Sequence, residues 1–356
     1  MKPLPTEYGQ LVQELLNLAA IKRQPVNGTF ELTSRCNLFC NMCYIRHSSN
    51  DCNIQKKELS ASQWLSLAHQ AVDNGMVFLL LTGGEVFLRP DFFQIYEPLT
   101  RMGLIITLFS NGTLITKAHA ARLADSPPNR MEITIYGASA NTYEKVTGVQ
   151  GSYARCCAGI EELIKYHIPL GLKTTLTKAN VGELRAMQQM ANNWGVPFSA
   201  GWLLTRRGDG NPSDVQNCRL SANDCISLEA DDIESFEEWS RASHRESSTR
   251  NNSNFNCQVG EAAFFITPTG KMNACLVLSQ PEADPLEVGF QNAWEHLQNF
   301  VHNAPAPSQA CFICDARNYC PRCPAWSFLE TDTLTEPVPY LCEIAHKRKE
   351  KYEQSI

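Results

Sequence analysis

The sequence lacks a long apolar segment, a secretory signal and a strong charge of either sign. No window approaches the roughly 18 consecutive apolar residues of a membrane span, and residues 1–28 hold no apolar stretch followed by a small-residue cleavage site. The formal net charge is −6 over 356 residues, which gives no sign of a surface for nucleic acid or anionic membranes. We therefore expect a cytoplasmic protein without nucleic-acid or membrane partners.

Cysteine, in contrast, is abundant. The chain holds 15 cysteines, and without a secretory context they favour metal ligation over disulfides. Hydrophobic residues make up 43% and charged residues 19%, a balance typical of globular proteins. The length suffices for one large domain and a smaller module.

Apolar periodicity predicts alternating strands and helices over residues 29–204. The expected strands are 29–34, 76–82, 104–110, 131–136, 170–177 and 196–204. The expected helices are 60–74, 91–102, 116–124, 152–167 and 180–194. This alternation predicts an α/β fold whose parallel sheet is curled by right-handed crossovers into a partial (β/α)6 TIM-like barrel. Functional residues then belong at the carboxyl ends of the strands.

Three further segments flank or follow this barrel. Residues 1–28 contain one amphipathic lead helix, expected over 8–21. In residues 205–255 the apolar periodicity fades, which indicates a connecting region with one helix near 231–243. Residues 256–356 form a small cysteine-rich domain.

The first cysteine motif is a C-x3-C-x2-C run directly after the first expected strand. Its members are Cys36, Cys40 and Cys43. A cubane iron–sulfur cluster normally takes four thiolates, so three thiolates leave one iron open to a substrate, as in catalytic zinc sites. A zinc loop or a group of buried free thiols is the alternative interpretation of the spacing.

This run resembles the signature of the radical S-adenosylmethionine (SAM) enzymes. The resemblance implies that SAM chelates the open iron of a [4Fe–4S] cluster through its amino and carboxylate groups. Reduction of the cluster then cleaves SAM to a 5′-deoxyadenosyl radical. A non-catalytic electron carrier is an alternative from another class, but a carrier needs no SAM pocket.

The same resemblance implies SAM contacts near the ends of later strands. Gly83-Gly84-Glu85 resembles the motif that holds the SAM amino group, although Val86 stands where the family usually has proline. Thr134 matches a hydroxyl that reaches the ribose, and Arg155 matches an arginine on the SAM carboxylate. Further polar contacts are implied at Ser110 and Asn111. For each residue the alternative is an ordinary structural role in a turn, strand or helix surface.

A second group of seven cysteines begins at Cys257. The others are Cys275, Cys311, Cys314, Cys320, Cys323 and Cys342, and a hairpin is expected between the first two, with strands at 263–267 and 271–273. Two C-x2-C pairs by themselves also suit a zinc ribbon. After a radical SAM core, however, the order resembles the SPASM domain, the auxiliary-cluster module of radical SAM enzymes that modify peptides and proteins.

The SPASM resemblance implies two auxiliary iron–sulfur clusters. One would be ligated fully by Cys311, Cys314, Cys320 and Cys342. The other would be held by Cys257, Cys275 and Cys323, with a fourth position that is open or filled by Cys225. Two residues precede Cys323 where the family commonly has three, so the sequence departs from the family pattern at this cysteine. Cys52, Cys156 and Cys157 are expected to be spectators, and Cys218 has no assigned role.

The composite resemblance implies a maturase of ribosomally made peptides that forms a thioether or carbon–carbon crosslink. Its partners would be a precursor peptide and an electron donor such as flavodoxin or ferredoxin. Sulfatase-type formylglycine formation is an alternative, but Leu276 stands where those enzymes carry an aspartate base. Peptide epimerisation and a small-molecule substrate such as a tetrapyrrole also stay open, and the sequence identifies no catalytic base.

Overall fold

Six parallel strands form the body of the molecule. In the computed structural model, which describes residues 6–209, 214–232, 239 and 254–353, they lie side by side in chain order. Their bounds are β1 Asn27–Glu31, β4 Phe78–Thr82, β5 Ile105–Ser110, β6 Arg130–Thr134, β7 Leu170–Thr175 and β8 Phe198–Gly201. The predicted partial barrel is confirmed, and no strand end lies more than three residues from the expected one.

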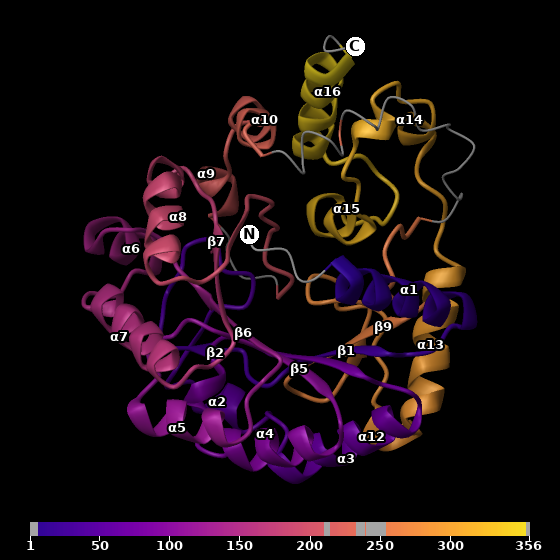
Figure 1. The fold of residues 1–356 in the computed structure, drawn as a ribbon. Coiled ribbons are helices and arrows are strands. Elements are labelled where there is room, and N and C mark those ends of the chain that lie inside the picture. Colours follow the sequence, from indigo (N-terminus) through magenta and orange to yellow (C-terminus); the bar gives the residue numbers. More distant parts are fainter. Residues whose placement is uncertain (1–5, 210–213, 233–238, 240–253, 354–356) are drawn as a thin grey trace.

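Helices connect these strands and cover the outside of the sheet. They are α3 Ala61–Asp73, α4 Phe92–Arg101, α5 Lys117–Asp125, α6 Ala140–Thr147, α7 Ser152–Lys165 and α8 Leu184–Asn193. Only α6 was not expected from the sequence. Ser60 begins α3 in a capping box with Gln63, which satisfies amide groups that a helix start leaves unpaired. Figure 1 shows these helices as an arc around the curved sheet.

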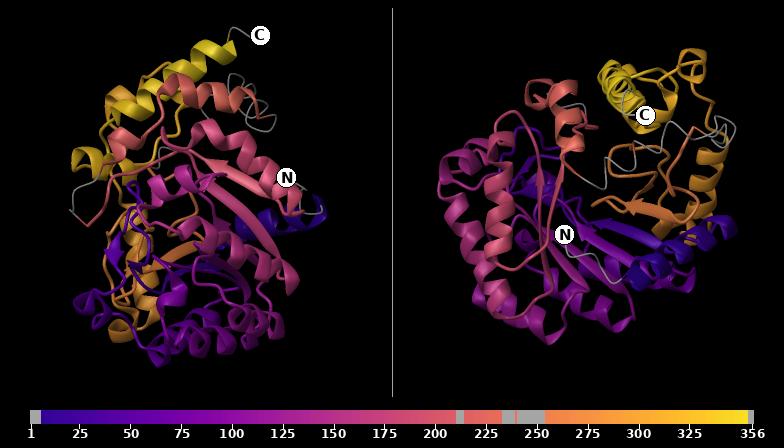
Figure 2. Two further views of the ribbon diagram at one scale, coloured as in Figure 1. Left: turned by 90° about the vertical axis from the view of Figure 1, so that its left-hand side faces the viewer. Right: turned by 45° about the horizontal axis from the view of Figure 1, so that its top comes forward.

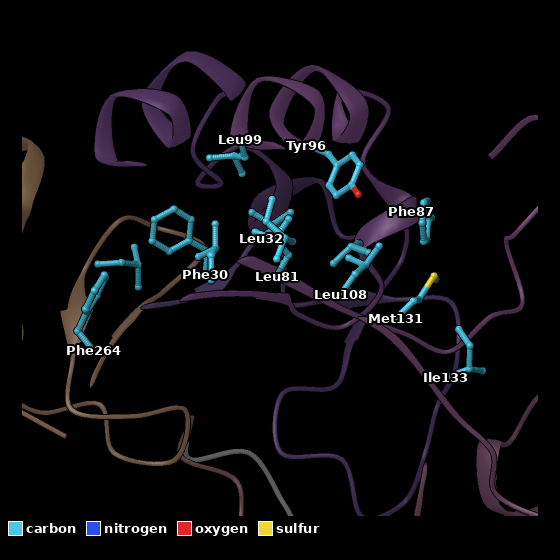
Figure 3. Close-up of a cluster of buried hydrophobic side chains, with 14 of the residues drawn as sticks. Phe30, Leu32, Leu81, Phe87, Tyr96, Leu99, Leu108, Met131, Ile133 and Phe264 are labelled. Atoms are coloured by element: carbon cyan, nitrogen blue, oxygen red, sulfur yellow. The ribbon is translucent and has the colours of Figure 1, made fainter. Parts of the chain in front are cut away.

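The core lies between the sheet and this arc of helices. Alternate strand residues such as Leu81, Leu108 and Met131 are fully buried there, and Figure 3 shows them pointing toward the overlying helices. Phe30 of β1 packs against Trp64 of α3 with ring centroids 5.0 Å apart. The intervening strand residues face the interior of the barrel, as the period of two requires.

The sheet continues into the cysteine-rich C-terminal region. β9 (Ala263–Ile266) pairs in parallel with β1, and β10 (Met272–Asn273) pairs antiparallel with β9. The predicted hairpin is therefore present, but its addition to the barrel sheet was not expected. Thr29 lies in register with Phe265, a pairing that joins residues more than 200 positions apart and leaves no local signal in the sequence.

The remaining C-terminal elements are mostly helices. They are α12 Pro285–Val288, α13 Phe290–His302, α14 Gln309–Phe312, α15 Pro324–Thr331 and α16 Pro339–Glu353. α16 packs against α10 (Ala222–Ala230), and a buried ion pair joins Arg348 to Glu229 at 2.5 Å. Figure 1 and both views of Figure 2 show α10, α15 and α16 gathered on one side of the barrel.

The predictions for the lead helix and for the connecting region have different outcomes. The lead helix is confirmed as α1 (Thr6–Lys22), which lies beside the amino-terminal ends of β1, β4 and β5. The helix expected near 231–243 falls almost entirely outside the described residues. Part of the expected connecting region is instead helical, as α9 (Val215–Cys218) and α10. Among the described residues, no helix is long and apolar enough to cross a membrane.

Candidate active site and cysteine clusters

The first three cysteines lie on one loop that leaves the carboxyl end of β1. A two-residue strand, β2 (Arg35–Cys36), pairs with β3 (His47–Ser48) and closes the loop at its base. The amide of Phe39 donates to the carbonyl of Thr147 at 2.8 Å, which ties the loop to the end of α6. One short loop therefore holds the three thiols at the carboxyl ends of the barrel strands, where functional residues were expected.

The three thiols are close enough to affect one another's ionisation. Burial raises the pKa of Cys40, and the charges of Cys43 and Cys36 raise it further. Burial also raises the pKa of Cys36 to about 12. Three mutually repelling thiols in a buried loop are a poor arrangement by themselves, but a cationic metal centre would compensate their charge. The donor set therefore fits an iron–sulfur cluster.

Polar side chains from the next strands contact these sulfurs. Asn111 Nδ2 lies 3.6 Å from Cys36 Sγ and also donates to Asn37 Oδ1 at 2.9 Å. The hydroxyl of Tyr136 donates to the sulfur of Cys40. Hydrogen bonds of this kind tune the electronics of cluster ligands. Tyr136 was not singled out from the sequence, although it is the last residue of the strand expected at 131–136.

Glu85 lies at the centre of the site and is fully enclosed. Its carboxylate accepts hydrogen bonds from Phe87 N at 3.1 Å, Asn111 N at 2.8 Å and Ser110 Oγ at 2.9 Å. Burial nevertheless raises its pKa to about 7. The structure thus brings three of the expected SAM contacts together, with Glu85 already bonded to the other two.

The two glycines before Glu85 allow the backbones of two loops to touch. A Cβ on Gly83 would lie 2.3 Å from the carbonyl oxygen of Thr33, and one on Gly84 would lie 2.3 Å from that of Arg35. Both contacts are far inside normal van der Waals distance, so any side chain here would push the cysteine loop away. The two glycines therefore allow the cysteine loop to lie directly against the backbone that follows β4.

The two remaining expected contacts lie apart from this cluster of hydrogen bonds. Thr134 is half-buried at the end of β6, on the strand face that lines the barrel interior. Arg155 is exposed in the first turn of α7, beside Gly151. The nearby Gly148 packs against Phe39 of the cysteine loop. The roles of Thr134 and Arg155 in binding SAM stay predictions.

Sequence reasoning missed two further residues beside the cysteine loop, Glu31 and Arg207. Tyr44 donates to Glu31 Oε1 at 2.9 Å, and burial raises the pKa of this carboxyl to about 7. Arg207 is buried and donates to the carbonyl of Arg46 at 3.1 Å. Burial raises the pKa of Cys43, and the positive charge of Arg207 opposes this rise. Glu31 ends the first strand and was therefore detectable from its position, whereas Arg207 lies in the segment 205–255, where the apolar periodicity fades.

Four of the C-terminal cysteines line one cavity of about 240 Å³. They are Cys311, Cys314, Cys320 and Cys342. Burial raises the pKa of Cys320 to about 11, and the charges of the other three add to this effect. This is the set that the resemblance assigned to one auxiliary cluster. Its enclosed, thiol-lined shape fits an iron–sulfur group, although His346 also lines the cavity and could join Cys314 in holding another metal ion.

The other three C-terminal cysteines form a separate group. Burial raises the pKa of Cys275 to about 11, followed by the charges of Cys323 and Cys257. Cys225, in contrast, is fully buried 3.5 Å from the hydroxyl of Tyr340. The charged neighbours that shift its pKa are Glu229, Arg348 and Asp224, with none of these three cysteines among them. The structure therefore gives no support to Cys225 as the fourth ligand.

Comparison with known proteins identifies the class. Residues 30–189 match the family model described as the Radical SAM superfamily. The chain therefore contains a radical SAM domain and is a radical SAM enzyme. The SPASM character of its C-terminal module stays a prediction. The predicted family is thus confirmed, and with it a [4Fe–4S] cluster and SAM as the cofactors that this family implies.

The similar proteins include a heme synthase and a peptide cyclase. An AdoMet-dependent heme synthase from Methanosarcina barkeri is 27% identical, over 91% of this chain and 98% of that protein. The PqqA peptide cyclase of Rhizobium meliloti is 32% identical, over 47% of this chain and 44% of that protein. Streptococcus suis SuiB, solved bound to its precursor peptide SuiA, has a TM-score of 0.70 at 14% identity over 96% of this chain and 82% of that one.

Proposed function

We propose that the chain is a peptide maturase that abstracts hydrogen from a ribosomally made precursor and forms a thioether or carbon–carbon crosslink. Cys36, Cys40 and Cys43 would hold the SAM cluster. When bound, the reduced cluster and SAM supply a 5′-deoxyadenosyl radical, and auxiliary clusters supply an acceptor for the electron released by bond formation. An electron donor such as flavodoxin or ferredoxin would reduce the enzyme.

The arrangement of the C-terminal cysteines is the observation that carries this proposal. The seven cysteines separate into a half-buried set of four that lines one cavity and a set of three, as two auxiliary clusters would require. Oxidative crosslinking needs such acceptors, whereas a redox-neutral radical reaction does not. The likeness to PqqA peptide cyclase and to SuiB, which is solved with a precursor peptide, supports a peptide substrate.

The chain's own residues would position SAM and exclude water. Glu85 holds the ends of β4 and β5 together beneath the cysteine loop, through Ser110 and Asn111. Gly83 and Gly84 bring the loop onto this support. Thr134 and Arg155 would contact the ribose and carboxylate of SAM. Leu276 is 45% exposed beside Cys275 and cannot accept a proton, which argues against sulfatase-type chemistry.

A tetrapyrrole substrate is the second candidate. The match to the M. barkeri heme synthase extends over nearly the whole of both chains, whereas the match to the peptide cyclase covers about half of each. An electron acceptor would serve any oxidative radical reaction, on a tetrapyrrole as on a peptide. The cysteine arrangement therefore does not separate the two candidates, and the substrate must be tested directly.

Mass spectrometry separates these candidates. The reconstituted enzyme is incubated anaerobically with SAM, dithionite and any short peptide encoded beside its gene, in heavy water. Loss of two hydrogens per event supports crosslinking, and one incorporated deuteron with unchanged connectivity indicates epimerisation. An unchanged peptide, together with decarboxylation of iron coproporphyrin III in a parallel reaction, would overturn the peptide proposal in favour of the tetrapyrrole.

A further inference from the structure

A layer of charged side chains lies inside the barrel, outside the site described above. Arg130 and Glu132 come from β6, and Lys173 comes from the adjacent β7. Arg130 Nε lies 2.9 Å from Glu132 Oε1, and Lys173 Nζ lies 3.7 Å from Glu132 Oε2. Lys173 Nζ also lies 2.7 Å from the ring centroid of Phe109 on β5. Its side chain therefore crosses the inner wall from β7 to β5.

These side chains are partly exposed rather than packed in the core. Lys173 is 24% exposed, Arg130 25% and Glu132 17%, although all three belong to interior strands of the sheet. Met131 and Ile133, which alternate with them on β6, are fully buried on the opposite face. Charge on the hollow side of a barrel strand is a position from which a bound molecule can be contacted.

The charged layer lies below the cysteine loop along the barrel axis. Glu132 and Thr134 share one face of β6, and Tyr136, two residues beyond the end of this strand, contacts Cys40. Over four residues of extended chain at about 3.3 Å each, Glu132 lies at most on the order of 13 Å below Tyr136. Thr134, an expected SAM contact, lies between them and is in register with Lys173. A substrate that extends from SAM into the barrel would meet Lys173.

The charges of this layer do not cancel. Two cations share one carboxylate, and the charges that act on Lys173 are those of Glu132 and Arg130. Both contacts of Glu132 are ion pairs, and Arg130 Nε lies closer to its carboxylate, at 2.9 Å, than Lys173 Nζ does, at 3.7 Å. Burial lowers the pKa of Lys173 to about 8, because one shared carboxylate compensates its charge only in part. A bound anion would supply the second negative charge that these two cations lack.

We propose that Lys173 binds a carboxylate of the substrate inside the barrel, with Glu132 and Arg130 orienting its ammonium group. A charge-assisted hydrogen bond in a partly dry interior suits this partner. The inference rests on the proposed function, because it locates the substrate of the same site. An acidic peptide side chain and a tetrapyrrole propionate share this chemistry, so the test includes both sources.

The test measures binding of two acids, each against its uncharged counterpart, to the reconstituted enzyme with SAM. The first pair is N-acetyl-aspartate N-methylamide and the corresponding asparagine compound, followed by ligand-observed NMR. The second pair is coproporphyrin III and its tetramethyl ester, followed by absorbance. At least one acid should bind ten times or more tighter than its counterpart, and the acid that does so identifies the source.

Substitutions of Lys173 and Glu132 test whether the acid binds at Lys173. Lys173→Met should weaken the preferred acid at least tenfold, whereas Lys173→Arg keeps the charge and should stay within about threefold. Glu132→Gln should tighten binding severalfold, because it removes the competing carboxylate; a purely structural ion pair would not give this opposite sign. Lys165→Met changes an exposed lysine of α7 that faces Glu162, and is the matched control.

Either of two results overturns the inference. One is that neither acid binds more tightly than its uncharged counterpart. The other is that Lys173→Met, shown to be folded by its thermal midpoint, binds the acids as the wild type does. Dithionite-driven SAM cleavage is measured in the same wild-type preparation, so that failure of the proposed function is seen separately.

Discussion

The two cysteine-rich regions of this enzyme are assembled in different ways. The first places three thiols within eight residues on one loop, closed by the short pairing of β2 with β3. The second collects seven thiols from 86 positions, through a hairpin added to the barrel sheet and several separate helices. Local spacing therefore identifies the first site, whereas the second depends on tertiary packing. Substitutions in the two regions should consequently differ in what they disturb.

The largest effect is expected in the first region. Cys40→Ala removes one of three ligands, and a [4Fe–4S] cluster held by two thiolates on this loop should not persist. We expect formation of 5′-deoxyadenosine to fall at least a thousandfold, with about four irons lost per chain. Chromatography of the reaction and iron analysis measure both. Retained SAM cleavage would disprove the assignment of this motif.

Cys52→Ala is the matched control for that substitution. Cys52 lies in α2 (Cys52–Gln55), is exposed, and its thiol faces the carbonyl of Asn50 at 3.6 Å. Although it follows the cysteine loop closely in sequence, iron content and SAM cleavage should equal those of the wild type.

The next effect concerns how the second region is held in place. Arg348→Met leaves the carboxylate of Glu229 buried between α10 and α16 without its 2.5 Å partner. Breaking a buried ion pair on one side costs about 3–5 kcal/mol. Thermal unfolding should therefore begin at a clearly lower temperature. Lys347→Met, which disrupts an exposed pair with Glu350, should change stability by less than about 1 kcal/mol; equal effects would show that the buried pair has no special role.

A smaller effect on catalysis is expected from the second set of thiols. Cys320→Ala removes one ligand from the set of four, far from the expected SAM contacts in sequence. We expect about four irons to be lost and product formation to fall roughly tenfold or more, with a smaller loss of 5′-deoxyadenosine than in Cys40→Ala. If zinc rather than an iron–sulfur cluster occupies this site, the iron content will be unchanged and zinc will be lost instead.

The smallest effect is a pH dependence in the first region. Burial raises the pKa of Glu85 from 4.5 to about 7, so between these values the folded state holds a proton that the unfolded chain has lost. The free energy of unfolding should therefore fall as the pH rises from about 5 to 8, by on the order of 2 kcal/mol. Denaturant unfolding of the metal-free protein at both pH values measures it. Glu85→Gln should reduce this slope and leave the part that Glu31 contributes, because burial raises the pKa of Glu31 to about 7 as well. An equal slope in the variant would contradict the attribution to Glu85.

The barrel was predictable because its signals are local. Each strand of the barrel has its own apolar pattern, and the helices between them have the 3.6-residue period, so the six strands and five of the helices could be expected. The cysteine loop and Gly83-Gly84-Glu85 follow strand ends directly. The parallel fold then brings these strand ends to one edge, where Glu85 meets Ser110 and Asn111.

The contacts that cross between distant segments were not predictable in this way. The pairing of β9 with β1, the buried position of Arg207 beside Cys43 and the burial of Cys225 against Tyr340 join residues with no shared periodicity. The domain limits drawn from the sequence stay a prediction, and the shared sheet shows that the barrel and the cysteine-rich region are structurally continuous.

The class of enzyme could be inferred from the sequence, because the spacing of three thiols on a single loop resembles the signature of the radical SAM enzymes. Family resemblance then divided the seven later cysteines into two sets. Which side chains and strands lie next to one another became clear only from the folded structure. It put Glu85 within a closed set of hydrogen bonds, added the hairpin to the barrel, and turned Lys173 and Glu132 toward a hollow interior. These outcomes depend on strand register and on burial, which arise only when the whole chain is packed.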